Sequence, residues 1–326
     1  MRAGVFAALM RAASVVALAG LLAGCEGMPF GAPPTAPKTS PLPTPAPGGA
    51  RDGEVVPPSA ESAAMREYLT RVGRALESQG LLRQDVAPRD APFTARQLAE
   101  DFIRIALYDE YSARGGGFVA EQQASRLRRW VKPVRMSVEF GPSIPLAQRR
   151  ADRSAISAYA GQLRRASGHP VSFGSGPGNF TVLVLNEDER RAAAPRLRQL
   201  VPGIDDASVS AITGLAPTTF CVAFAFSSGN SPEYDRVVAV IRGEHPDRMR
   251  ISCIHEELAQ GMGLANDSPR ARPSIFNDDE EFALLTRHDE LLLRMLYDPR
   301  LTPGMTEAEA RPIVQTIAAE LMGGES

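Results

Sequence analysis

Three short runs of apolar residues constrain the fold of this chain more than any other feature. They are FTVLVL at residues 180–185, TFCVAFAF at 219–226 and VVAVI at 237–241. Runs of this length, rich in β-branched and aromatic residues, are typical of buried strands. Because stretches with helical spacing precede and follow them, the order of elements predicts an α/β (α+β) domain with a mixed sheet.

Further elements complete this domain. Strands are predicted at 130–140, where Pro133 argues for an edge position or a bulge, and at 171–173. The predicted helices span residues 60–79, 94–108, 144–166, 187–200, 249–264, 286–296 and 306–322. We expect one domain over 92–326, preceded by an N-terminal helical segment over 59–91.

Composition excludes several classes of protein. The chain has 326 residues, of which 44% are hydrophobic, and carries 36 Lys plus Arg against 38 Asp plus Glu. This apolar fraction excludes a disordered acidic chain, and three Cys are too few for a disulfide scaffold. The near-zero net charge and the scattered arginines favour no nucleic-acid partner.

The N-terminus has the pattern of an export signal. Arg2 and Arg11 form a positive region before a short apolar stretch at 12–22, which leads into an LAGC sequence ending at Cys25. That ending resembles the bacterial lipobox and makes residues 1–25 a lipoprotein leader segment, which implies cleavage just before Cys25 and lipidation of Cys25 as the new N-terminus. The alternative is an ordinary signal peptide with a coincidental Cys. By the sorting rules of such lipoproteins, Glu26 favours the outer membrane over the inner one.

A proline-rich segment follows the leader. Residues 26–58 are dense in Pro and lack apolar periodicity, so they cannot bury a core and are expected to be a disordered tether. The expected location is therefore the bacterial cell envelope, facing the periplasm. The expected partners are a membrane, through the lipid anchor, and an unknown envelope protein or ligand.

One stretch carries most of the chemistry. Residues 253–267 read CIHEELAQGMGLAND, and the start imitates the zinc motif HExxH but fails because Ala259 stands at the fifth position. At about 100° per residue, His255 also points away from Gln260. Four residues instead share one side of the predicted helix: Cys253, Glu256, Glu257 and Gln260.

In a second register the stretch resembles the metzincin pattern HExxHxxGxxH/D. Glu256, Gln260 and Asn266 stand at the three metal-ligand positions, Glu257 stands at the general base and Gly263 at the turn glycine. The resemblance implies a zincin-like domain in which this helix corresponds to the active-site helix.

The resemblance continues beyond the helix. The residues SIF at 274–276 stand where a metzincin has its Met-turn, with Phe276 in place of Met, and a predicted helix follows. The stretch also carries the complete signature C-x-x-E-E-x-x-Q-x-x-G-L-x-N-D. On that signature and its flanks, residues 92–305 resemble the bacterial exported proteins of the domain-of-unknown-function family 2927. No activity of that family can be transferred.

The replaced ligands leave several interpretations open. An active zinc peptidase is disfavoured, because a carboxylate and two amides are poor zinc donors. A harder divalent metal could be held by Glu256, Gln260 and Asn266 or Asp267. Metal-free acid–base chemistry of Glu256 and Glu257 is a second interpretation.

The third interpretation is structural or binding, with Gln260 and Asn266 satisfying buried hydrogen bonds. It is the one we favour: a non-catalytic envelope lipoprotein with a degenerate metzincin-like domain. A divergent hydrolase with Glu257 as general base is the alternative. A divalent metal is the one cofactor that the pattern allows.

The remaining Cys and His residues are candidates for a disulfide and for metal ligands. Cys221 and Cys253 lie in one domain of an expected exported protein, which favours a disulfide over two buried free thiols. None of the four His has metal-ligand spacing to another. His169 and His245 precede prolines and are expected at the surface, and His288 is expected as a helix cap or surface residue.

Overall fold

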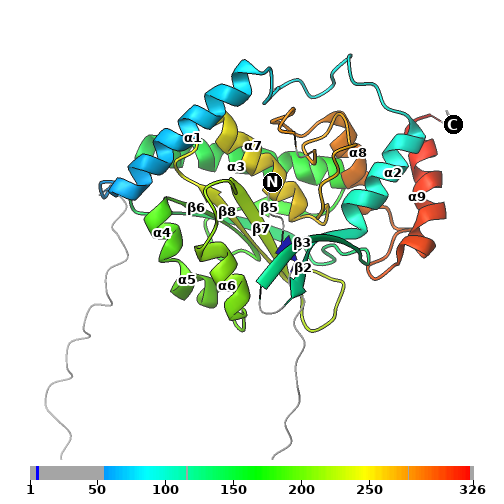
Figure 1. The fold of residues 1–326 in the computed structure, drawn as a ribbon. Coiled ribbons are helices and arrows are strands. Elements are labelled where there is room, and N and C mark those ends of the chain that lie inside the picture. Colours follow the sequence, from blue (N-terminus) through cyan, green and yellow to red (C-terminus); the bar gives the residue numbers. More distant parts are fainter. Residues whose placement is uncertain (1–4, 7–54, 115–116, 278, 324–326) are drawn as a thin grey trace, which may run out of the picture.

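The computed structural model describes residues 5–6, 55–114, 117–277 and 279–323 (Figure 1). Cys25, the leader apart from residues 5–6, and the tether up to residue 54 lie outside the described residues. No helix in the described part of the chain is both long enough and apolar enough to span a membrane.

The centre of the fold is a six-stranded sheet. Its order is β1-β7-β8-β6-β4-β5, and all neighbours are parallel except β7 and β8. The strands are β1 (Val5–Phe6), β4 (Val134–Phe140), β5 (Val171–Phe173), β6 (Phe180–Leu185), β7 (Cys221–Phe226) and β8 (Arg236–Arg242). A separate antiparallel hairpin joins β2 (Tyr108–Arg114) and β3 (Gly117–Ala124). The mixed α/β prediction is confirmed.

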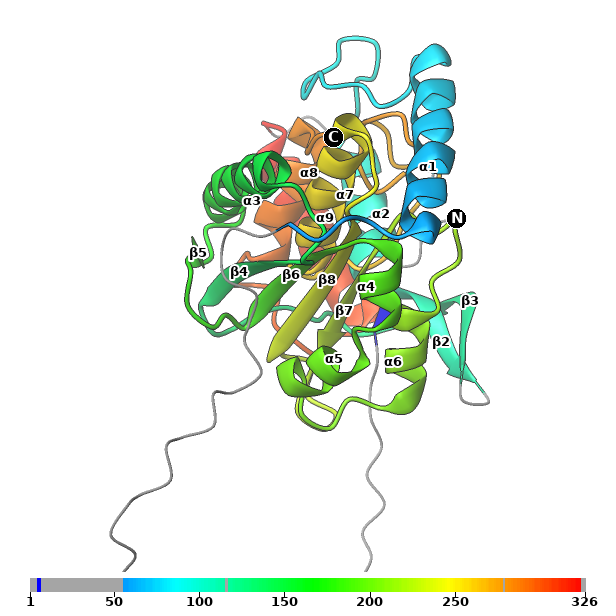
Figure 2. The ribbon, with the colours of Figure 1, turned by 90° about the vertical axis from the view of Figure 1, so that its left-hand side faces the viewer.

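Helices cover both faces of the sheet (Figures 1 and 2). They are α1 (Ala60–Ser78), α2 (Ala95–Ala106), α3 (Leu146–Ser167), α4 (Glu187–Arg191), α5 (Ala194–Leu200), α6 (Asp206–Thr213), α7 (Asp247–Gln260), α8 (Arg287–Leu296) and α9 (Glu307–Leu321). One core contains residues of α2, α3, α7, α8 and α9, and a second core on the opposite face contains residues of α5 and α6.

The packing of helices on both faces of the sheet explains the apolar runs in the sequence. Along β8, Val238 and Val240 belong to the core under α5 and α6, whereas Val237, Ala239 and Ile241 belong to the core under α7. Successive side chains of a strand point to opposite faces, so a strand buried on both sides must be apolar at every position.

Proline accounts for two differences from the predicted elements. The strand predicted at 130–140 begins at Val134, directly after Pro133, and it pairs on both sides, so Pro133 marks neither an edge strand nor a bulge. The helix predicted at 187–200 is divided into α4 and α5, with Pro195 in the first turn of α5. Proline lacks a backbone N–H donor and is tolerated at the start of a helix but not inside it.

Besides β1, two elements were absent from the sequence-based expectation. The first is α6, which begins at the N-cap Asp205, whose side chain accepts a hydrogen bond from Ser208 N. The second is the β2–β3 hairpin, placed at 108–124, where only a Gly-rich turn was expected.

A disulfide joins the sheet to the helix that carries the signature. Cys221 at the start of β7 is bonded to Cys253 in α7, with 5.8 Å between their Cα atoms, as predicted. The helix ends at Gln260 rather than near residue 264, because a turn begins at Gly261. The polar residues of the signature are thereby placed at the C-terminal end of α7.

Candidate functional site

The polar residues of the signature are buried. Glu256, Glu257 and Gln260 are each 1% exposed, and Asn266 and Asp267, which follow the turn, are 0% and 3% exposed. Lys, Glu and Asp side chains are rarely this buried unless their polar groups have partners. The arrangement of hydrogen bonds therefore decides what this group of residues can do.

The two carboxylates lie close together. Oxygen atoms of Glu256 and Glu257 and the Sγ of Cys221 are all within 4.8 Å of one another. The sulfur is part of the disulfide, so it is not available as a thiolate ligand. Two carboxylates at this distance in a buried site favour a positive charge between them.

Gln260 and Asn266, which stand at the other two predicted ligand positions, form hydrogen bonds inside the protein. The Nε2 of Gln260 donates to Asp267 Oδ1 at 3.2 Å, and the Nδ2 of Asn266 donates to the carbonyl oxygen of Arg104 at 2.8 Å. The backbone N of Asn266 also donates to the carbonyl of Ile105 at 3.0 Å. These bonds connect the end of α7 to the following loop, and that loop to the end of α2.

The amide oxygens of the same two residues remain available. Gln260 Oε1 and Asn266 Oδ1 are buried and accept no hydrogen bond from the described residues. Because both amide nitrogens are already used, the orientation of each amide is set. The site therefore offers oxygen atoms to a ligand, and oxygen donors suit a hard cation or an amine better than zinc.

The metal and base assignments stay predictions. Within the described residues, the one group of three His, Cys, Asp or Glu side chains close enough for a common ion is Cys221, Glu256 and Glu257. The role of Glu257 as general base is likewise not tested by these contacts.

A glycine is required in the turn after α7. Gly263 has φ +123°, and a Cβ at this position would lie 2.4 Å from the carbonyl oxygen of Arg128. A side chain is thus excluded both by the backbone conformation and by the neighbouring chain. The turn glycine of the signature has a physical reason in this fold.

The turn at 274–276 is fixed by Asp289 in the first turn of α8. Ser274 Oγ donates to Asp289 Oδ1 at 2.5 Å, and Ile275 N donates to Asp289 Oδ2 at 3.1 Å. The ring of Phe276 is 0% exposed and belongs to the core under α7. Sequence reasoning missed Asp289, although it forms a capping box with Thr286 that the T-x-x-D spacing could have indicated.

The expectation for His288 was wrong, because this side chain is completely buried. Its Nε2 lies 3.1 Å from Asp101 Oδ2, and its Nδ1 lies 3.6 Å from Asp289 Oδ1. Burial lowers the pKa of His288, but the hydrogen bond with Asp101 and the negative charge of the nearby Asp289 outweigh burial and raise it to about 8. A protonated imidazole therefore balances two buried carboxylates.

The other histidines have structural roles. His245 is buried rather than exposed, with Nε2 2.9 Å from the carbonyl oxygen of Phe220, and His169 is partly buried. His255 Nδ1 accepts a hydrogen bond from Leu285 N, and burial lowers the pKa of His255 to about 4. A neutral His255 facing the Tyr159 ring cannot serve the carboxylate pair.

Comparison with known proteins identifies the family. A family model described as protein of unknown function (DUF2927) matches residues 95–316. Because the match covers most of the chain, this protein belongs to that family. No curated protein and no solved structure matches the chain.

The burial of His288 predicts a pH dependence of stability. Its pKa is raised in the folded state from 6.5 to about 8, so its contribution is fully present below pH 6.5 and is lost as pH rises through 8. The expected loss is about 2 kcal/mol in the free energy of unfolding. Urea unfolding between pH 6 and 9 measures it, with His169→Gln as a control that keeps the same profile. A flat profile across this range would contradict the ion pairs.

The Gly263 turn predicts a strong effect of a small substitution. Gly263→Ala is expected to lower the free energy of unfolding by about 2 kcal/mol or more, because the added Cβ meets the Arg128 carbonyl. The matched control is Gly174→Ala, since an added Cβ there meets no atom within 4 Å. Denaturant midpoints of the two variants compare them. Equal midpoints would show that the turn is not constrained in this way.

Proposed function

We propose that this chain is a cell-envelope lipoprotein whose domain is a non-catalytic binding module on a degenerate metzincin-like scaffold. The acyl chains on Cys25 hold it at a membrane, and residues 26–58 form the tether. The buried polar residues after α7 contribute to ligand binding rather than to zinc catalysis.

The anchor is supported by sequence and by covalent chemistry. The charged N-terminus, the apolar stretch and the LAGC ending at Cys25 all fit a lipoprotein leader. The disulfide between Cys221 and Cys253 fits an exported protein, because disulfides persist in oxidising compartments such as the periplasm.

The scaffold is supported by the order of elements around α7. A mixed sheet is followed by α7, by the turn at Gly263, by the buried turn at 274–276 and by α8. This is the succession that the sequence resemblance to metzincins implies. Phe276 fills the core below α7 at the position of the expected Met-turn residue.

One observation carries the non-catalytic interpretation. The amide nitrogens of Gln260 and Asn266 are committed to Asp267 and to the Arg104 carbonyl, so the residues at two zinc-ligand positions tie the fold together. Their oxygens can accept hydrogen bonds from a bound amine or coordinate a hard cation. The third position is a carboxylate, Glu256, in place of an imidazole nitrogen.

The alternative function is a divergent hydrolase. It is favoured by the short distance between the carboxylates of Glu256 and Glu257, because a buried carboxylate pair can hold and release a proton. In that case Glu257 would act as the base. Glu256, with Gln260 and Asn266, would hold a divalent metal or contact the substrate.

Metal analysis of the purified full chain separates these proposals. The wild-type chain is expected to hold no stoichiometric zinc. The variant Glu256→His/Gln260→His/Asn266→His is expected to gain one zinc per chain if the three positions converge as in a metzincin. Glu67→His/Arg71→His is the matched control, because it places two imidazoles at the same i,i+4 spacing on α1 alone.

The contrary outcomes are distinct. Stoichiometric metal in the wild-type chain that is lost in Glu256→Ala would favour the hydrolase. A folded triple variant that binds zinc no better than the α1 control would contradict the metzincin-like scaffold. If Asn266→His disrupts folding by removing the tie to Arg104, Glu256→His/Gln260→His keeps that tie and provides the comparison.

Cell fractionation tests the anchor. Cys25→Ser is expected to move the protein from the membrane fraction to the soluble fraction, because its thiol is the acylation site. Glu26→Asp is the matched variant: it keeps the Cys and is expected to shift the protein from the outer to the inner membrane. A membrane-bound Cys25→Ser protein would contradict the lipoprotein assignment.

A further inference from the structure

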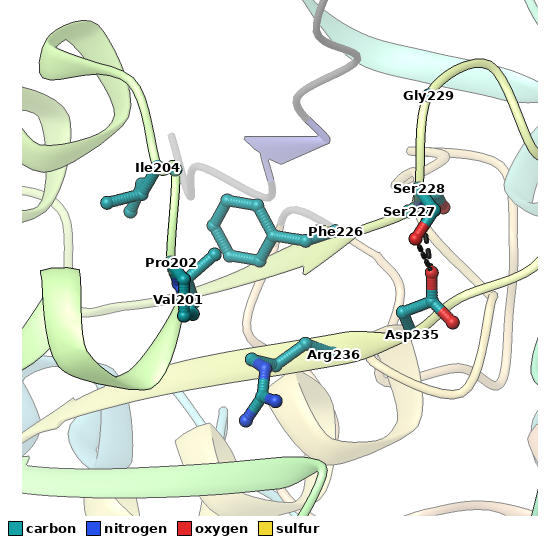
Figure 3. Close-up of a pocket in the computed structure, with 10 residues that line it drawn as sticks. Val201, Pro202, Ile204, Phe226, Ser227, Ser228, Gly229, Asp235 and Arg236 are labelled. Atoms are coloured by element: carbon teal, nitrogen blue, oxygen red, sulfur yellow. Dashed lines mark hydrogen bonds between the residues drawn. The ribbon is translucent and has the colours of Figure 1, made fainter. Parts of the chain in front are cut away.

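A second concave site lies on the other side of the sheet from α7. A cavity of about 480 Å³ is formed between the loop after α5 and the connection from β7 to β8 (Figure 3). Its volume is in the range of small-molecule sites. It lies at the Phe226 end of β7, whereas the disulfide to α7 is at the Cys221 end.

The cavity contains a cation that pairs with no side chain in the part of the chain that the structure describes. The Arg236 guanidinium makes no hydrogen bond or ion pair with any described residue. It is partly buried at the start of β8. A cation in such a place gains more from an anion than one in open water, because the surrounding protein lowers the effective dielectric.

The neighbouring carboxylate is committed elsewhere. Asp235 Oδ1 accepts from Lys132 Nζ at 3.1 Å, and Asp235 Oδ2 accepts from Ser228 N at 2.9 Å and Ser228 Oγ at 2.5 Å. These hydrogen bonds, that from Ser228 above all, lower the pKa of Asp235. Figure 3 shows the Asp235 carboxylate turned toward Ser228, with the Arg236 side chain extending away from it.

The remaining wall of the cavity is largely apolar. Val201, Ile204 and Phe226 line it and belong to the core under α5 and α6. Ser227 also lines this space, and a serine hydroxyl can donate a hydrogen bond. A charged end and an apolar wall in one cavity select a ligand that has both features.

We propose that this cavity binds a small organic carboxylate, with the carboxylate paired to Arg236 and its apolar part against Phe226. A single negative charge fits better than two, because the Asp235 carboxylate is adjacent in the chain and repels a dianion. A guanidinium can bind a carboxylate through two parallel hydrogen bonds. This site is separate from the polar residues of α7 and does not depend on the function proposed for them.

Ligand-observed NMR titration of the full chain tests the proposal with three probes. Benzoate has the proposed charge, benzamide is its neutral analogue and phenyl phosphate carries a second charge. Benzoate is expected to bind in the millimolar range, on the order of what a fragment of this size achieves. Benzamide and phenyl phosphate are expected to bind about tenfold more weakly.

Variants of arginine assign the site. Arg236→Gln is expected to weaken benzoate binding about tenfold, and Arg236→Lys less, because lysine keeps the charge without the paired donors. Arg164→Gln, which removes an exposed arginine from α3, is the control with unchanged binding. Absence of benzoate binding, equal binding of benzamide, tighter binding of phenyl phosphate or an unaffected Arg236→Gln protein would each overturn the proposal. If Arg236→Gln does not fold, the relative binding of benzoate, benzamide and phenyl phosphate to the wild-type chain still tests the proposal.

Discussion

The packing of α7 against the sheet is the interaction on which the rest of the structure depends. Apolar side chains of α7 fill the core beside β7 and β8, and the disulfide between Cys221 and Cys253 holds the two elements together. A helix placed this deeply has no solvent-facing side near its end. Its polar residues Glu256, Glu257 and Gln260 are therefore buried, and burial obliges each of them to find partners inside the protein.

Those partners connect α7 to elements distant in sequence. Asn266 is bonded to the end of α2, and the buried His288 at the start of α8 is paired with Asp101, also in α2. Asp289 in turn holds the turn at 274–276. The loops that surround the candidate site are thus fixed by a neutral hydrogen bond of Asn266 and by charge-assisted contacts of Asp289 and His288, which lose strength if one charge is removed. The site is a preorganised set of oxygen acceptors rather than a set of nitrogen ligands.

The two proposed binding regions differ in chemistry and lie on opposite faces of the sheet. The region after α7 presents carboxylate and amide oxygens, which suit a cation or an amine. The cavity at Arg236 presents a guanidinium and an apolar wall, which suit an organic anion. The sheet separates them, because α7 covers one face and α5 and α6 cover the other.

The sequence by itself determined the elements whose causes are local, and the family. Strand β6 matches its run at 180–185 because burial on both faces favours apolar side chains, and the capping box at Thr94 marks the start of α2. Only the tertiary structure decided which polar groups are buried together. His288 meets Asp101 across 187 residues of sequence, and Asp235 bonds to Lys132 and Ser228 while no described residue pairs with Arg236. Such pairings depend on distances between elements, which residue patterns along one chain segment do not contain.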